Sequence, residues 1–233
     1  MNPVVFGSAV LEALRSLADF LFPPACLVCG CDCPGERKLC GDCERELTET
    51  ALLYEPPRRT LEHINLTSVL LPYDSSCREL VHAFKYRGMQ SVASFFGKLM
   101  ARKTLPRLGA FSGAPLIPVP LHPTKLRERG YNQCRSIADG FASFAGNPIR
   151  EDLIARTVNT GTQTALDHEE RARNVRDAFT YTGEMSLSGR PVILIDDVMT
   201  TGSTLSECAR VLKEGGAGEI AVCVVATPDV GED

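Results

Sequence analysis

An apolar run that leads into two carboxylates and a hydroxyl-rich turn is the segment with the clearest chemistry. Val192–Ile195 is uninterrupted by polar residues, Asp196 and Asp197 follow it, and a helix is predicted from Thr204. Ligands of parallel sheets bind at the carboxyl ends of the strands. A helix N-terminus adds unpaired N–H groups and the positive end of a dipole. The segment therefore predicts a phosphate cradle beside carboxylates that sugar hydroxyls or a Mg²⁺-bound ligand can satisfy.

The turn between the carboxylates and the helix supplies the donors of that cradle. Hydroxyls come from Thr200, Thr201, Ser203 and Thr204, and Gly202 permits close backbone approach or positive φ. A Thr or Ser N-cap alone is common, so the prediction depends on the complete string. That string matches the phosphoribosyl-pyrophosphate (PRPP) signature of type I phosphoribosyltransferases. The Gly-Lys-Ser/Thr ending of a Walker loop is absent.

A second charged segment precedes this one along the chain. A strand predicted at Pro115–Val119 runs into a loop that carries Lys125, Arg127 and Arg129 within five positions. Ammonium and guanidinium groups suit a doubly ionised pyrophosphate. The strand-to-loop segment is similar to the one that precedes the pyrophosphate loop in amidophosphoribosyltransferases. A solvated basic loop is the alternative interpretation.

A third segment, rich in hydroxyls, resembles the flexible loop of the same superfamily. It contains Arg156, Thr162, Gln163, Arg171 and Asn174. The resemblance implies a loop that closes over bound PRPP and excludes water. An ordinary surface loop is the alternative.

Six of the ten cysteines lie between positions 26 and 43. Two Cys-x-x-Cys pairs, Cys26/Cys29 and Cys40/Cys43, supply four thiolates for a tetrahedral, structural Zn²⁺. Cys31 or Cys33 could replace one of these ligands, or the Cys-x-Cys-x-Cys run could be redox-active. A set of thiols without metal is the remaining alternative. A secreted disulfide framework would spread its cysteines more evenly.

The other patterns indicate an α/β fold with a mostly parallel sheet flanked by helices. Predicted strands and helices alternate from residue 66 onward. They comprise strands at Thr67–Leu71, Leu153–Arg156 and Ile220–Ala226, helices at Arg78–Tyr86, Val92–Lys103, Ser136–Phe144 and Thr204–Glu214, and a helix or helical turn at Arg171–Phe179. We expect an N-terminal Cys-rich module over residues 1–50, a linker over 51–65 and a larger domain over 66–233.

Composition excludes some classes of protein. The 233 residues carry a net charge of −4, so any binding of nucleic acid would need a local basic patch. Residues 1–22 show apolar positions at helical spacing, but charges interrupt them, unlike a signal peptide or a membrane span. We expect this segment to be a helix that docks on the protein itself. The cytoplasm is the expected location.

Taken in order, the motifs resemble the ComF family of competence-associated proteins. They are a Cys-x-x-Cys pair, Lys85–Gly88, Pro118–Pro123, Arg129–Gln133, Thr162–Leu166, Arg171, Asn174–Val175, Ala178–Phe179 and Asp196–Thr204. The resemblance implies a type I phosphoribosyltransferase-like domain with a zinc-ribbon-like module in front, and a link to DNA uptake. It implies that Asp196 and Asp197 hold the ribose and Mg²⁺, that Thr200–Thr204 hold the 5-phosphate, and that Lys125, Arg127 and Arg129 hold pyrophosphate.

The reaction and its acceptor stay open at this stage. An enzyme would displace pyrophosphate from PRPP, with an acceptor pocket built from residues 51–110, where His82 and Lys85 are candidates. The competing class is a non-enzymatic factor that binds single-stranded DNA and keeps the PRPP pocket as a sensor or relic. A PRPP-binding transcriptional co-regulator is disfavoured by the lack of a helix-turn-helix signal.

Overall fold

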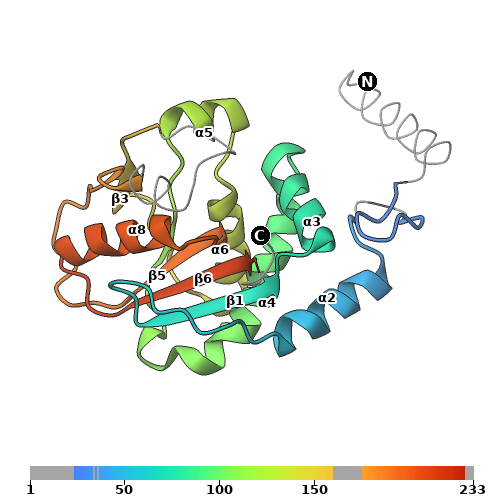
Figure 1. The fold of residues 1–233 in the computed structure, drawn as a ribbon, viewed down its shortest axis with the longest axis horizontal. Coiled ribbons are helices and arrows are strands. Elements are labelled where there is room, and N and C mark those ends of the chain that lie inside the picture. The colour runs from blue at the N-terminus through green and yellow to red at the C-terminus, as the bar shows by residue number, and fades with distance from the viewer. Residues whose placement is uncertain (1–23, 34, 36, 160–174, 229–233) are drawn as a thin grey trace, which may run out of the picture. The chain divides into compact units, whose positions relative to one another are not determined.

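The computed structural model describes residues 24–33, 35, 37–159 and 175–228, and it divides into two compact units, Met1–Glu49 and Thr50–Asp233 (Figure 1). The helix expected in residues 1–22 lies outside the described residues. The described elements are α2 (Gly41–Leu53), β1 (Leu66–Pro72), α3 (Ser75–Tyr86), α4 (Gln90–Leu108), the 3₁₀ helix η1 (Gly109–Phe111), β2 (Leu116–Pro118), α5 (Pro123–Arg129), α6 (Gln133–Ala145), β3 (Ile154–Arg156), β4 (Phe179–Tyr181), β5 (Val192–Val198), α8 (Ser203–Glu214) and β6 (Ile220–Thr227).

The larger unit is built on a four-stranded parallel sheet with the strand order β1-β6-β5-β2. Strands β5 and β6 lie in the middle and are buried almost throughout, which explains why their sequences are nearly continuous apolar runs. Strand β5 extends beyond its apolar run of Val192–Ile195 and ends at Val198. Both carboxylates of the Asp196–Asp197 pair therefore lie within the last part of the strand.

Helices cover both faces of this sheet. Figure 1 shows α8 on one side and α4 and α6 on the other. Two glycines allow α4 and α6 to cross closely. A Cβ atom at Gly97 would lie 2.0 Å from the Ile137 carbonyl oxygen, and one at Gly140 would lie 2.0 Å from the Ser94 carbonyl oxygen. Only residues without a side chain fit at these two positions, so the crossing is specified by the sequence.

The helix or helical turn predicted at Arg171–Phe179 is wrong at its C-terminal end, although residues 175–177 form a turn with helical character. Residues 171–174 lie outside the described part, and Phe179 begins β4, which pairs antiparallel with β3 in a separate two-stranded sheet. Alternating aromatic and β-branched residues favour a strand here, with Phe179 buried and Thr180 exposed. The strand predicted at Leu153–Arg156 is present as β3, in this small sheet.

The loop expected after the second strand contains a helix, α5. Pro123 occupies its first turn, the Nδ1 atom of His122 accepts a hydrogen bond from the Thr124 N–H at 3.2 Å, and Gly130 ends the helix at φ 81°. Proline at the start and glycine in the left-handed region at the end are ordinary helix boundaries. The basic residues of this segment are therefore displayed on a helix.

In the smaller unit, backbone hydrogen bonds connect the described residues near the cysteines. The N–H of Gly30 donates to the Cys26 carbonyl at 2.9 Å, and the Cys26 N–H donates to the Cys31 carbonyl at 2.8 Å. Helix α2 starts directly after Cys40.

Among the described residues of the whole chain, none of the helices has both the length and the apolar character of a membrane span.

Candidate functional site

Two adjacent carboxylates at the end of β5 form the centre of the candidate site. Asp196 is 9% exposed and Asp197 5%, so both are largely withdrawn from water. Backbone groups satisfy part of each carboxylate, since the Asp197 N–H donates to Asp196 Oδ1 at 2.9 Å and the Val198 N–H donates to Asp197 Oδ1 at 2.6 Å. Two buried like charges are costly, so the remaining oxygens require partners.

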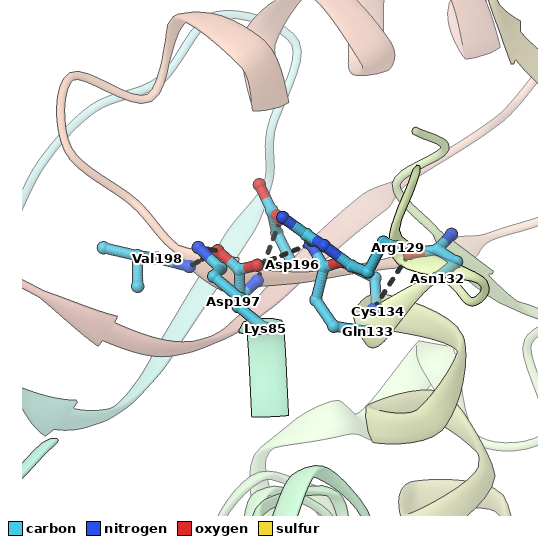
Figure 2. Close-up of polar contacts among 8 residues, drawn as sticks. All are labelled: Lys85, Arg129, Asn132, Gln133, Cys134, Asp196, Asp197 and Val198. Atoms are coloured by element: carbon cyan, nitrogen blue, oxygen red, sulfur yellow. Dashed lines mark hydrogen bonds and ion pairs between the residues drawn. The ribbon is translucent and has the colours of Figure 1, made fainter. Parts of the chain in front are cut away.

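Asp197 finds two partners from distant parts of the chain (Figure 2). Lys85 Nζ, from the last turn of α3, lies 2.7 Å from Asp197 Oδ1. Gln133 Nε2, from the first turn of α6, donates to Asp197 Oδ2 at 2.6 Å. Burial disfavours the charged form of Lys85, but the carboxylates of Asp197 and Asp196 outweigh it and raise the pKa of the lysine. The carboxylate is thus held as one half of a buried ion pair.

Asp196 has a less polar environment. Its Oδ1 accepts a hydrogen bond from the Cys134 thiol at 3.3 Å. Burial and the adjacent charge of Asp197 raise the pKa of Asp196 to about 7. The pair therefore combines one carboxylate neutralised by a lysine and one that holds a proton more readily than an ordinary aspartate.

The turn between α5 and α6 explains how Gln133 and Cys134 reach the carboxylates at the end of β5. Gly130 reverses the chain after α5, and Asn132 then caps α6 by accepting the Cys134 N–H at 3.0 Å. The Asn132 amide also donates to the Val119 carbonyl at 3.1 Å, which ties the cap to the end of β2. An Asn N-cap fixes the first turn of a helix, and here that turn points Gln133 and Cys134 at the carboxylates.

The raised pKa of Asp196 makes a prediction about stability. The folded state retains a proton between the ordinary pKa of 3.8 and about 7, whereas the unfolded state has already lost it. The folded state then binds more protons, so the free energy of unfolding of the ligand-free protein falls by a few kcal/mol as the pH rises through this window. Urea unfolding across the window checks this, and Asp196→Asn is expected to remove most of the slope. A slope unchanged in that variant would contradict the assignment.

The hydroxyl-rich segment forms the turn into α8. Gly202 adopts φ 84°, one of the two roles that the sequence left open for it, and a Cβ atom there would lie 2.5 Å from Leu61 Cδ2. The Thr201 and Ser203 hydroxyls lie 2.8 Å apart. The N-cap residue Gly202 has no side chain to bond the first turn of α8, and the Ser203 N–H donates to Thr201 Oγ1 at 3.3 Å. The turn borders a cavity of about 490 Å³ whose lining includes Thr201, Ser203 and Arg176. Thr200 is exposed and Thr204 half-buried, and neither lines this cavity.

The structure separates the three basic residues of α5. Lys125 and Arg129 line a cavity of about 290 Å³ together with Lys85, whereas Arg127 is exposed and does not line it. Arg129 also donates to Gln133 Oε1, so a chain of contacts runs from the basic helix to the carboxylate of Asp197 (Figure 2). Burial, with help from nearby arginines, lowers the pKa of Lys125. Such crowding of cations favours an anion in the cavity.

The remaining predicted residues are placed as follows. Thr162, Gln163 and Arg171 of the expected flexible loop lie outside the described residues. The rings of His82 and Tyr86 are in contact, with centroids 4.9 Å apart and planes tilted by 45°. Sequence reasoning assigned no role to Gln133 or Cys134, and considered Lys85 only as a candidate for the acceptor pocket. The available signal was the Gly-x-Asn that reverses the chain and caps α6.

Four cysteine sulfurs form a separate cluster in the smaller unit. The Sγ atoms of Cys26, Cys29, Cys40 and Cys43 all lie within 4.8 Å of one another, a group that could hold a metal ion. Burial disfavours the Cys26 thiolate, but the N–H groups of Cys29, Cys40 and Val28 outweigh it and lower the pKa of Cys26 to about 6. The two Cys-x-x-Cys pairs therefore converge.

Comparison with known proteins bears out the expected resemblance. Residues 139–233 match the family model "Phosphoribosyl transferase domain". The DNA utilization protein YhgH of Shigella flexneri is 29% identical over 210 residues, covering 84% of this chain and 87% of that protein. Competence protein F of Haemophilus influenzae is 35% identical over 108 residues, covering 46% and 47%. Competence protein ComFC of Bacillus subtilis is 28% identical over 209 residues, covering 89% and 79%. The domain match and the parallel sheet confirm the predicted phosphoribosyltransferase-like fold.

Proposed function

We propose that this homologue of the ComF-type competence proteins, with its phosphoribosyltransferase domain, binds PRPP at the carboxyl end of β5 and transfers or recognises its phosphoribosyl group in DNA uptake. The observation that carries the proposal is a buried carboxylate pair at the end of a strand, followed by a short turn to a positive-φ glycine and a helix N-terminus. Asp196 and Asp197 would bind the ribose hydroxyls. The N–H and hydroxyl groups of residues 200–204 would bind the 5-phosphate.

Transfer would break the bond between C1 of the ribose and the pyrophosphate oxygen and form a bond from an acceptor, an amine nitrogen in most such enzymes, to C1. The ribose then develops oxocarbenium character, by analogy with other glycosyl transfers. Lys125 and Arg129, which line one cavity with Lys85, would stabilise the negative charge on departing pyrophosphate. Arg127 would contribute from the exposed side of α5, where its Nη2 lies 3.4 Å from the Thr124 hydroxyl. Residues Thr162, Gln163 and Arg171 would form the closing loop.

The carboxylate pair also suits Mg²⁺. One oxygen of Asp196 and one of Asp197 lie within 4.8 Å of each other and of Cys134 Sγ. Mg²⁺ prefers oxygen ligands, so the carboxylates rather than the thiol would hold it together with oxygens of the ligand. When bound, the ion would neutralise charge on the pyrophosphate.

We assign a structural Zn²⁺ to Cys26, Cys29, Cys40 and Cys43, because these four sulfurs all lie within 4.8 Å of one another. Cys31 and Cys33 do not belong to that set, although the Cys31 thiol contacts those of Cys29 and Cys40. A closed site of four thiolates leaves no open position for catalysis. None of the ten cysteines forms a disulfide, which suits the reducing cytoplasm, where we place the protein.

A second candidate function is binding of single-stranded DNA, with the PRPP pocket serving as a sensor or relic. The observation that favours it is Tyr86, whose side chain is 65% exposed and lies under the Arg129 guanidinium at 5.2 Å from the ring centroid. An aromatic ring beside cations is the platform on which nucleic-acid bases stack.

One pair of assays separates the two candidates. Incubation with Mg²⁺-PRPP and a panel of amine acceptors, with pyrophosphate as the measured product, is expected to show acceptor-dependent release. The Asp196→Asn/Asp197→Asn variant is the control that should release none. Single-stranded DNA binding that weakens steeply with salt, without pyrophosphate release from any acceptor, would instead support the second candidate.

A further inference from the structure

A cavity of about 550 Å³ lies along the edge strand β1, apart from the carboxylate pair. The irregular segment that precedes β1 forms one wall, and β1 and α4 form the others. The lining comprises Glu55, Pro56, Pro57, Arg58, Arg59, Thr60, Leu61, Ile64, Asn65, Leu66, Thr67, Ser68, Val69, Lys103, Arg107 and Met199. Of the residues assigned above to PRPP, none that the structure describes lines it.

A buried lysine is the unusual feature of this cavity. Lys103 is only 6% exposed, and its Nζ donates to the Tyr54 carbonyl and lies 5.4 Å from the centroid of the Tyr54 ring. Within the described part of the chain, no carboxylate forms an ion pair with Lys103. Burial, opposed only in part by Glu55, lowers the pKa of this lysine to about 8. A buried ammonium without a carboxylate partner favours an external anion.

The rest of the lining adds positive charge and apolar surface. Four cationic side chains, Arg58, Arg59, Lys103 and Arg107, face one carboxylate, Glu55. Arg107 is paired with that carboxylate, and Arg58 is exposed at the cavity. Prolines and aliphatic side chains form the remaining wall. A pocket with apolar walls and a few placed charges is the usual form of a small-molecule site.

We infer that this cavity binds a small organic anion with a planar or apolar body, at a site distinct from the proposed PRPP pocket. The anionic group would sit among Lys103, Arg58 and Arg107, and the body would lie against the prolines and aliphatic residues. The volume of the cavity admits a ligand of mononucleotide size.

The site adjoins the turn proposed to bind the 5-phosphate. Arg59, a lining residue, donates to the Thr200 carbonyl and, at 3.3 Å, to the Pro228 carbonyl. Leu61 lines this cavity and also lies against Gly202. An occupant that moves Arg59 or Leu61 would therefore change the affinity of the turn for its ligand. By linkage, a ligand bound at the turn would change the affinity of the cavity for its occupant by the same factor.

The full chain can be tested with 8-anilinonaphthalene-1-sulfonate, an organic anion with a planar apolar body, titrated by calorimetry and by fluorescence. We expect saturable binding of one equivalent. Lys103→Met and Arg58→Gln are each expected to weaken it by about tenfold, the effect of losing one charged contact. Lys98→Met and Arg102→Gln are matched controls, because both residues are exposed on α4 and neither lines the cavity.

Three outcomes would overturn the inference. They are the absence of saturable binding, an affinity unchanged in both Lys103→Met and Arg58→Gln, or complete loss of the dye in the Asp196→Asn/Asp197→Asn variant. The last result would place the dye in the proposed PRPP pocket. Because the readout is dye binding, failure of this inference is distinguishable from failure of PRPP binding.

Discussion

Replacing Cys40 by Ser is expected to abolish zinc binding and to unfold the ordered residues around the cysteine cluster. Among residues 24–33, 35 and 37–49 of the smaller unit, Leu39 is the one buried apolar side chain besides the cysteines, so metal binding would supply the folding free energy of this segment, on the order of 10 kcal/mol for zinc-finger peptides. Zinc content by elemental analysis, and proteolysis of residues 24–49, measure the two effects. A chelator should reproduce both in the wild-type protein.

Cys31→Ser tests the alternative ligand, because the exposed Cys31 contacts the thiols of Cys29 and Cys40 but is not one of the four sulfurs that all lie within 4.8 Å of one another. This variant should keep one equivalent of zinc and resist proteolysis as the wild type does. The assignment would be wrong if Cys31→Ser lost the metal, or if Cys40→Ser kept it at full stoichiometry.

Replacing Lys85 by Met is expected to destabilise the larger unit by about 3 kcal/mol. The Lys85 side chain is 20% exposed and that of Asp197 7%, so the ion pair is largely desolvated. Removing one partner leaves a buried carboxylate without its counter-charge, and this is the costly way to break such a pair. Urea unfolding at neutral pH measures the loss.

The double variant Lys85→Met/Asp197→Asn separates charge from packing. It should recover part of the lost stability, because the uncompensated charge is gone. The expected signature in the double-mutant cycle is a double variant that loses less stability than the two single variants together. Lys98→Met, on the exposed face of α4, should change stability little. Equal destabilisation in the single and the double variant would show that Lys85 acts through packing alone.

Much of the fold could be predicted because its signals are local. The buried strands β5 and β6 are continuous apolar runs, and Gly215 and Gly216 follow the end of α8 as predicted. The secondary-structure prediction was wrong in two segments where the sequence is compatible with more than one kind of element. The basic segment after β2 was expected to be a loop, although Pro123 and Gly130 are ordinary helix boundaries. The strand at Phe179 was missed because a helical pattern was extended too far.

The candidate site was only partly predictable for a related reason. Adjacent residues such as Asp196 and Asp197, and the turn that follows them, can be recognised as one string. Lys85 lies 112 positions from the carboxylate that it neutralises, and Gln133 lies 64 positions away. No periodicity or spacing reports such a contact. The packing of α3 and α6 around the end of β5 brings these side chains together.

Calorimetric titration of Mg²⁺-PRPP into the zinc-loaded protein tests the central claim most directly, with the Asp196→Asn/Asp197→Asn variant alongside. Our account predicts saturable binding of one equivalent by the wild type and loss of binding in the variant. Circular dichroism should show that the variant is still folded. No binding by a folded wild-type protein would contradict the PRPP site and leave single-stranded DNA binding as the leading candidate.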